Sequence, residues 1–398
     1  MRLFVALLPF LLAASTLGCA AYDRPSGPGG ATGRDVDAAL PPRTGMLFWS
    51  PEHQVAGYRN TDRIFDTRTI HAGGEPHPLV PAPRDFSGVT YELDGATYTL
   101  DDYLRDKRVA GLLVVKDGKI LLERYTLGND ENSRWISFSI AKSVVSMLIG
   151  AAIADGYIGS VDEPVTRYLP LLAGSGYEGV SIRNVLQMAS GVAWNEDYAD
   201  PKSNVASTPP GNLALVQYMS QRPREATPGE TFNYNTGETN LAGALLRAAI
   251  GNNLSTYLER EIWQPFGMES DATWMLHEAG GGELGGCCIS ATLRDYARIG
   301  IFAMGGGVLR DGTRVLPEGW MAESTAPSKG SEGYGYLWWL RDDGAYAGIG
   351  IFGQLLWMDP QSKIVIVTHS AWPTAVGREL NRHRWAFVGA LAAAAREM

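Results

Sequence analysis

The chain has 398 residues, of which 45% are hydrophobic, so it is long enough to bury one large core or the cores of two closely joined subdomains. Its formal net charge is -9 and it has few basic runs, which argues against a nucleic acid as its partner. Its 47 glycines include several clusters, but none has the pattern that holds phosphates.

The N-terminus has the composition of an export signal. An apolar stretch (residues 3–12) follows a basic residue and precedes small ones, which predicts a signal peptide over residues 1–18 and not a membrane-spanning helix. The sequence TLGC at 16–19 is similar to the cleavage box of bacterial lipoproteins, so Cys19 is the expected lipidation site. Ordinary secretion with a nearby cleavage site is the alternative. We expect an exported protein, held on the periplasmic side of a bacterial cell envelope by its lipid, which would be its only contact with the membrane.

Two segments are expected between this signal and the globular domain. Residues 19–42, after the lipidated cysteine, are rich in Gly, Pro and Asp and are predicted to be a disordered spacer. Residues 43–105 contain many prolines, Pro76 and Pro78 among them, and are expected to wrap around the domain as an extended segment without a core of its own. The domain itself is predicted over residues 106–398.

Five strands are predicted in two groups that lie far apart in the sequence. Each group consists of β-rich runs separated by turn signals such as Asp117-Gly118. The runs are 109–115, 119–125, 334–340, 348–358 and 363–369. We expect one antiparallel sheet assembled from both ends of the domain, with a helix over residues 377–398 covering one face. Residues from about 136 to 314 are mostly helical in pattern and would form a second lobe, with the active site where the lobes meet.

Ser139 and Lys142 stand three residues apart at the start of an apolar segment that is expected to form a buried helix. At this spacing two side chains share a helix face, so the lysine amine can hydrogen-bond the serine hydroxyl and take its proton. Such pairs also occur by chance, and the pair alone is weak evidence. The uncharged run over residues 143–154 strengthens it, because burial lowers the pKa of a lysine, as a general base requires.

Two later segments add to this pair. Residues 232–236 (FNYNT) place Tyr234 just after a turn signal, although a lone tyrosine there is usually a packing residue. Residues 348–354 (GIGIFGQ) contain glycines that let a backbone approach a substrate closely, and tight strand packing explains these glycines equally well.

In this order the three motifs resemble those of the superfamily of serine β-lactamases and penicillin-binding proteins, in particular the class C type with Tyr-x-Asn. The third motif of that superfamily carries Lys-Thr-Gly or His-x-Gly, whereas residues 348–354 contain neither lysine nor histidine. The chain looks most like the 6-aminohexanoate-dimer hydrolases and family VIII carboxylesterases, in which that lysine is often absent. Residues 186–198 (LQMASGVAWNEDY) are similar to a substrate-side loop of this branch, and the resemblance runs from about Arg108 to the C-terminus.

The resemblance implies a two-lobed α/β (α+β) fold, with an antiparallel five-stranded sheet flanked by helices and a mainly helical lobe. It also implies acyl transfer through a covalent ester. Ser139 would attack an ester or linear amide while neutral Lys142 accepts its proton, directly or through Tyr234. Tyr234 would then protonate the leaving group. The backbone N–H groups of Ser139 and Ile351 would form the oxyanion hole.

The resemblance further implies that Tyr198, Thr236 and Gly350 contact the substrate. Thr236 stands where class C enzymes have an asparagine, and the last motif offers no cation for a β-lactam carboxylate. We therefore expect turnover of short esters, of linear amides such as aminohexanoate oligomers if Tyr198 reaches the amide, and little or none of penicillins.

Two alternatives stay open: a β-lactamase or DD-peptidase-type penicillin-recognising enzyme, and a non-catalytic binding protein on the same fold. No cofactor is expected, and no cysteine and histidine spacing suggests a metal site. Cys287 and Cys288 are expected to be buried free thiols, because adjacent cysteines rarely bridge each other. The expected partner is a small-molecule ester or amide, and the oligomeric state is left open.

Overall fold

The computed structural model describes residues 40–398. The predicted signal peptide, Cys19 and nearly all of the predicted spacer lie outside the described residues. Within residues 40–398, no helix is both long enough and apolar enough to cross a membrane.

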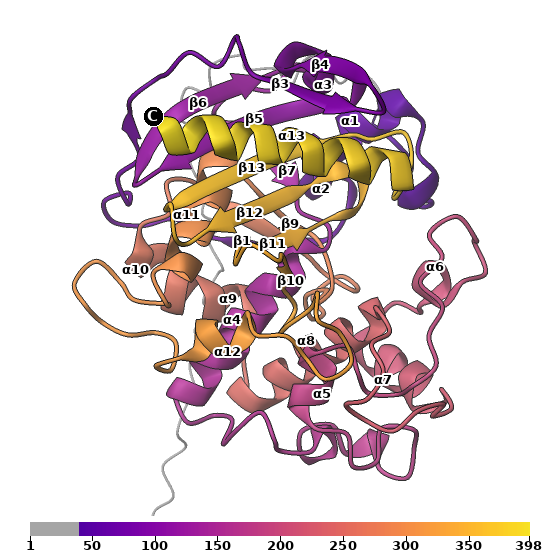
Figure 1. Ribbon diagram of the computed structural model, residues 1–398. Helices are drawn as coiled ribbons and strands as arrows, with labels where there is room; N and C mark the ends of the chain where they lie inside the picture. The colour runs from indigo at the N-terminus through magenta and orange to yellow at the C-terminus, as the bar shows by residue number, and fades with distance from the viewer. Residues whose placement is uncertain (1–39) are drawn as a thin grey trace, which may run out of the picture.

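A seven-stranded sheet forms the upper part of the molecule in Figure 1. Its strand order is β10-β11-β12-β13-β5-β6-β2, antiparallel except for the parallel pair of β2 and β6. At its centre β13 pairs with β5, for example Val367 with Leu113, so both ends of the domain meet there as predicted. The strands are β2 (Val80–Pro81), β5 (Val109–Lys116), β6 (Lys119–Tyr125), β10 (Trp339–Leu340), β11 (Tyr346–Ile349), β12 (Leu355–Asp359) and β13 (Ile364–Ser370).

The prediction of a single strand over residues 348–358 is wrong. The chain turns back between β11 and β12, through the short helical turn η6 (Ile351–Gly353). Phe352 and Gly353 both have left-handed backbones there, with φ of 58° and 94°. The turn is apolar because Phe352 is buried against Tyr58 and Phe138, and this composition made it look like strand. The run predicted over residues 334–340 forms a strand only at its end, as β10.

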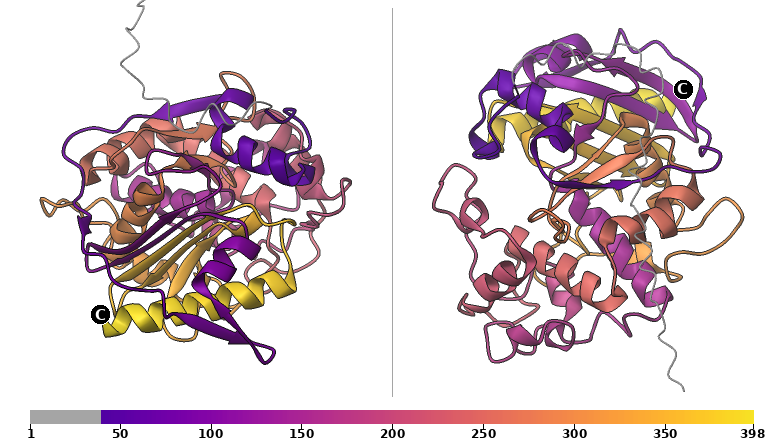
Figure 2. Two further views of the ribbon diagram at one scale, coloured as in Figure 1. Left: turned by 90° about the horizontal axis from the view of Figure 1, so that it is seen from above. Right: turned by 180° about the vertical axis from the view of Figure 1, so that it is seen from behind.

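Helices cover both faces of the sheet, as Figures 1 and 2 show. The alternation of side chains along β5 explains this, since Leu112 and Val114 pack toward α13 (Arg378–Glu397) and α3 (Leu100–Asp106). The other face packs against α11 (Leu293–Met304) and the adjoining α4 (Ile140–Ala154). The predicted C-terminal helix is thus confirmed as α13. α11 falls inside the predicted helical lobe in sequence but packs on the sheet instead.

The lower part of Figure 1 is mainly helical. It contains α5 (Ile182–Leu186), α6 (Asn204–Ser207), α7 (Asn212–Ser220), α8 (Thr236–Ile250), α9 (Leu254–Leu258), α10 (Gln264–Phe266) and α12 (Trp320–Ser324). A four-stranded antiparallel sheet joins it to the upper part, in the order β1 (Thr67–Ile70), β8 (Ala272–Met275), β9 (Ile289–Ala291) and β7 (Trp135–Ile136).

Residues 43–105 wrap around the domain by adding a strand to each of these sheets, β1 to one and β2 to the other. They also form the hairpin of β3 (Thr90–Leu93) and β4 (Ala96–Thr99), and the helices α1 (Pro51–Arg59) and α2 (Thr61–Ile64) besides α3. The prediction of an extended segment did not include these helices.

Candidate active site

Ser139 lies at the N-terminal cap of α4, directly after a residue with a strained backbone. Phe138 has a φ of 45°, in the left-handed region that phenylalanine rarely adopts. Its ring packs edge-on against Tyr58, with 5.1 Å between the ring centroids, and this packing holds the turn. The turn places Ser139 on the wall of a cavity.

Lys142 is 1% exposed, and its amine contacts three oxygen atoms. Nζ lies 3.0 Å from Ser139 Oγ, 3.0 Å from Thr236 Oγ1 and 2.7 Å from the carbonyl oxygen of Gly286. Burial lowers the pKa of Lys142 to about 8, while the Glu196 carboxylate raises it. The helix predicted from Ser139 and Lys142 and the contact between them are both present in the structure.

Glu196 is a member of the site that the sequence analysis did not single out. It accepts hydrogen bonds from the Tyr198 hydroxyl at 2.6 Å, from the backbone N–H of Thr236 at 3.0 Å and from the Thr236 hydroxyl. Because the Thr236 hydroxyl donates to Glu196, it can only accept from Lys142. The only available signal for this role was an acidic residue inside the loop that resembles a substrate-side loop.

The surroundings of Lys142 fix the direction of its hydrogen bonds. A neutral amine has two N–H donors and one lone pair. The Gly286 carbonyl can only accept, and the Thr236 hydroxyl is held as an acceptor, so these two atoms take both N–H groups. The lone pair is left for the proton of Ser139. A glycine at 286 permits this approach, since a Cβ there would lie 2.8 Å from Thr236 Cγ2.

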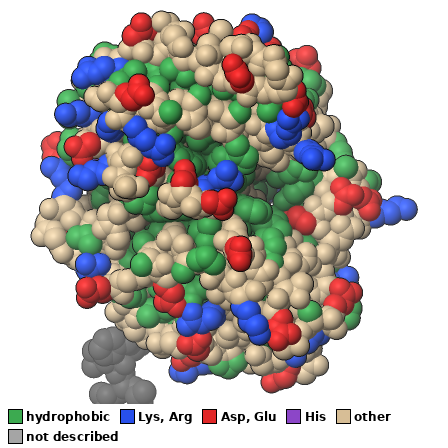
Figure 3. Space-filling model, viewed as in Figure 1, with side chains coloured by type: hydrophobic (Ala, Val, Ile, Leu, Met, Phe, Trp, Pro, Cys, Tyr) green, Lys and Arg blue, Asp and Glu red, His purple; other side chains and the backbone are tan. Residues whose placement is uncertain are grey.

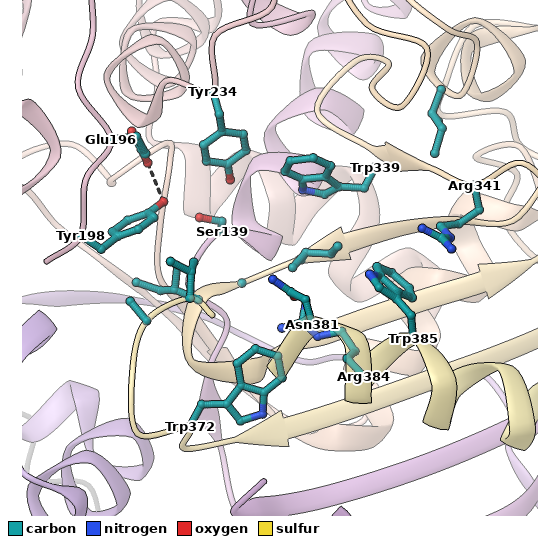
Figure 4. Close-up of a pocket in the computed structure, with 16 residues that line it drawn as sticks. Ser139, Glu196, Tyr198, Tyr234, Trp339, Arg341, Trp372, Asn381, Arg384 and Trp385 are labelled. Carbon is teal, nitrogen blue, oxygen red and sulfur yellow. Dashed lines mark hydrogen bonds between the residues drawn. The ribbon is translucent and has the colours of Figure 1, made fainter. Parts of the chain in front are cut away.

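Tyr234 directly precedes α8, whose N-cap Asn235 accepts a hydrogen bond from the backbone N–H of Glu238 at 2.9 Å. The Tyr234 ring stacks on Trp339, and its hydroxyl points toward Ser139 (Figure 4). Burial raises the pKa of Tyr234 well above its usual range, and the Glu196 charge adds to this effect. Tyr234 therefore stays protonated near neutral pH, which suits a proton donor.

Two residues that line the same cavity, Ser139 and Ile351, have backbone N–H groups that are free within the described part of the chain. Within residues 40–398, neither the Ser139 N–H nor the Ile351 N–H donates a hydrogen bond to another group of the protein. Ile351 lies at the start of η6 and lines the cavity together with Gly350, whose own N–H is bound to the Gln354 carbonyl. Free N–H groups beside a nucleophile are the arrangement that an oxyanion hole requires.

Two cavities meet at Ser139, and both are also lined by Tyr198 and Ile351. The first has a volume of about 540 Å3 and the second about 470 Å3. In the space-filling view a hollow opens between the two parts of the molecule, with hydrophobic side chains on its walls and charged ones at its rim (Figure 3). Three further residues of the first cavity that the sequence analysis did not single out are Arg341, Asn381 and Arg384 (Figure 4).

Cys287 lines the second cavity and is joined to Cys288 by a disulfide. The prediction of two free thiols was therefore wrong. The backbone of Cys288 has a φ of 116°, an uncommon conformation that accompanies the bridge between neighbours. Among residues 40–398, no cluster of three or more His, Cys, Asp or Glu side chains is placed to hold a metal ion.

The chain was compared with known protein families and proteins. The model of the family described as Beta-lactamase matches residues 99–390. The chain belongs to this family. It is 32% identical over 299 residues to the 6-aminohexanoate-dimer hydrolase of Paenarthrobacter ureafaciens, an alignment that covers 69% of this chain and 75% of that protein.

Solved structures share the fold. A candidate 6-aminohexanoate-dimer hydrolase from Bacillus anthracis superposes with a TM-score of 0.78 and 20% identity, over 89% of this chain and 96% of that one. A family VIII carboxylesterase superposes with a TM-score of 0.56 and 15% identity, over 73% of this chain and 94% of that one. The superfamily and the fold implied by the motifs are confirmed, and the protein is a serine hydrolase of the amidase or esterase kind.

Proposed function

We propose that the protein cleaves a small ester or linear amide through a covalent acyl-enzyme, with Ser139 as nucleophile and Lys142 as base. The hydrogen bonds around Lys142 carry this proposal. They leave its lone pair directed at Ser139 Oγ, 3.0 Å away, and burial keeps part of the amine neutral near pH 8. The named activities of two similar proteins, hydrolysis of 6-aminohexanoate dimer and of carboxylic esters, support the substrate class.

The reaction starts when Ser139 Oγ attacks the substrate carbonyl and its proton passes to Lys142. The N–H groups of Ser139 and Ile351 hold the oxyanion. As the tetrahedral intermediate collapses, the bond to the leaving group breaks and Tyr234 donates a proton to the departing nitrogen or oxygen. Lys142 then returns its proton to Tyr234. Water releases the acyl group in a second attack, with Lys142 again as the base.

The test uses Ser139→Ala with p-nitrophenyl butyrate as substrate and a fluorophosphonate as covalent label. We expect the wild type to turn over the ester and take up one label per chain, and the variant to do neither while keeping its circular dichroism spectrum. Ester turnover by the pure variant would contradict the proposal. A kcat/KM for a penicillin or cephalosporin above that for every ester and linear amide would favour the β-lactamase alternative instead.

A further inference from the structure

Arg384 is a buried cation that forms no ion pair or hydrogen bond with any of residues 40–398. It is 3% exposed, and its Nε is buried without a hydrogen-bond acceptor. No carboxylate within residues 40–398 forms an ion pair with it, and its guanidinium lies over the ring of Trp372, 4.2 Å from the centroid. A buried charge without a partner is costly. Since Arg384 lines the first cavity together with Ser139, a group of the substrate can supply the missing partner.

The rest of the first cavity suits the same partner. Arg341, at the exposed edge, lies over the ring of Trp385 and has no ion-pair partner among the described residues. Asn381 stands one helical turn before Arg384 on α13 and points toward the cavity (Figure 4). Two guanidinium groups and an amide around one cavity are donors for a carboxylate. Glu196 also lines this cavity, but its oxygens already accept hydrogen bonds from Tyr198 and Thr236.

The second cavity has a different character. Its walls are largely apolar, and no Asp or Glu lines it, although His277 and Arg43, which is paired with Asp66, also belong to its lining. The apolar side chains include Met46, Leu47, Phe65, Val205, Met275 and Leu276. Such a cavity suits a hydrocarbon chain, whereas a chain that ends in an ammonium group finds no carboxylate there.

Tyr234 decides which part of the substrate occupies which cavity. It lines the first cavity and not the second. Because Tyr234 protonates the leaving group in the proposed mechanism, the leaving group lies in the first cavity and the acyl chain in the second.

We propose that the substrates are N-acyl amino acids: an apolar acyl chain in the second cavity, joined by an amide bond to an amine that carries a carboxylate bound by Arg384. This inference rests on the proposed function. Ser139 forms the acyl ester, the C–N bond breaks, and the amino acid leaves with a proton from Tyr234. Water then releases the fatty acid. Aminohexanoate dimer shares the carboxylate of the leaving group but has an ammonium group on its acyl part, so it fits less well.

The test compares N-octanoylglycine with N-octanoylglycinamide, which differ only in the carboxylate. The wild type should prefer the acid in kcat/KM by about 10- to 100-fold, as expected for a buried charge-assisted hydrogen bond. Arg384→Gln should reduce this ratio to about one. Arg382→Gln is the matched control, because Arg382 lies on the same helix but pairs with Asp94 and Glu379 on the surface. It should keep the wild-type ratio.

A second variant tests the other cavity. Val205→Trp should shift the preferred acyl chain from octanoyl toward butanoyl and leave the ratio of acid to amide unchanged. If Arg384→Gln does not fold, the preference of the wild type between the two substrates decides the matter. A wild-type ratio of one or less would overturn the inference, as would a chain preference that Val205→Trp does not change. If p-nitrophenyl butyrate is hydrolysed through Ser139 and neither acyl glycine is, the inference fails while the proposed function stands.

Discussion

Lys142 and Arg384 are both buried basic residues of the candidate active site, but their surroundings differ. The Lys142 amine has three oxygen atoms around it, and the Arg384 guanidinium has no acceptor within the described residues. Burial lowers both pKa values, to about 8 for Lys142 and about 10 for Arg384. Near neutral pH the lysine is therefore partly neutral, as a base must be, while the arginine stays charged. The hydrogen bonds of Lys142 are made within the protein and orient it for a proton transfer, whereas Arg384 lacks an acceptor among residues 40–398, and a ligand can supply one.

The largest effect is expected from replacing Lys142, the cation whose hydrogen bonds are satisfied within the protein. Lys142→Ala should lower kcat for p-nitrophenyl butyrate at least about 1000-fold, because Ser139 loses its base. Lys142→Arg should be equally inactive, since a guanidinium keeps the charge but does not deprotonate near neutral pH. Steady-state kinetics and circular dichroism of both variants check this. More than a tenth of wild-type activity in Lys142→Arg would mean that the side chain acts only through its charge.

Tyr234 should show its role through the leaving group. Tyr234→Phe should lower kcat about 100-fold on a linear amide, which needs a proton on its nitrogen, and much less on a p-nitrophenyl ester, whose phenolate leaves without one. The ratio of the two losses is the measurement. Equal losses on both substrates would assign Tyr234 to the first proton transfer from Ser139.

The pH dependence of kcat/KM tests the role of Lys142 and the effect of Glu196 on its pKa. Because Lys142 acts as the neutral amine, kcat/KM should rise with pH through about 8 and level off above it. The Glu196 charge raises the pKa of Lys142, so Glu196→Gln should move this rise to lower pH. The variant should also lose about 10-fold in kcat, because Thr236 and Tyr198 lose a hydrogen-bond acceptor. If the rise of kcat/KM stays at the same pH in Glu196→Gln or moves to higher pH, it does not report the titration of Lys142.

The smallest effect concerns Glu238, a buried ionisable group on α8 outside the two cavities. Burial raises the pKa of Glu238 to about 8 from an unfolded value of 4.5, against hydrogen bonds from Ser190 and Tyr177. The unfolded carboxyl ionises at lower pH than the folded one, so this group lowers stability progressively between pH 4.5 and 8. Glu238→Gln should therefore raise the free energy of unfolding by about 2–4 kcal/mol at pH 8. Urea unfolding at pH 4, where no gain is expected, is the control.

Much of the candidate active site could be predicted from the sequence because its main contact, between Ser139 and Lys142, is local. Ser139 and Lys142 are three residues apart on one helix, so their distance depends on helix geometry and little else. The central strands β5, β6 and β13 were also predictable, since their apolar runs are bounded by clear turns. The turn at Phe352 was not, because its aromatic ring is buried by residues that lie far away in the sequence, Tyr58 and Phe138.

The sequence by itself determined the family, the contact between the proposed nucleophile and its proposed base, and the central strands of the sheet. Only the tertiary structure decided that Glu196 orients Thr236, that Cys287 and Cys288 are bridged, and that Arg384 of the C-terminal helix reaches the cavity of Ser139. The physical reason is the range of the interactions. Hydrogen bonds within one helical turn follow from spacing alone, whereas a carboxylate or guanidinium from a distant segment is placed by the packing of the whole domain.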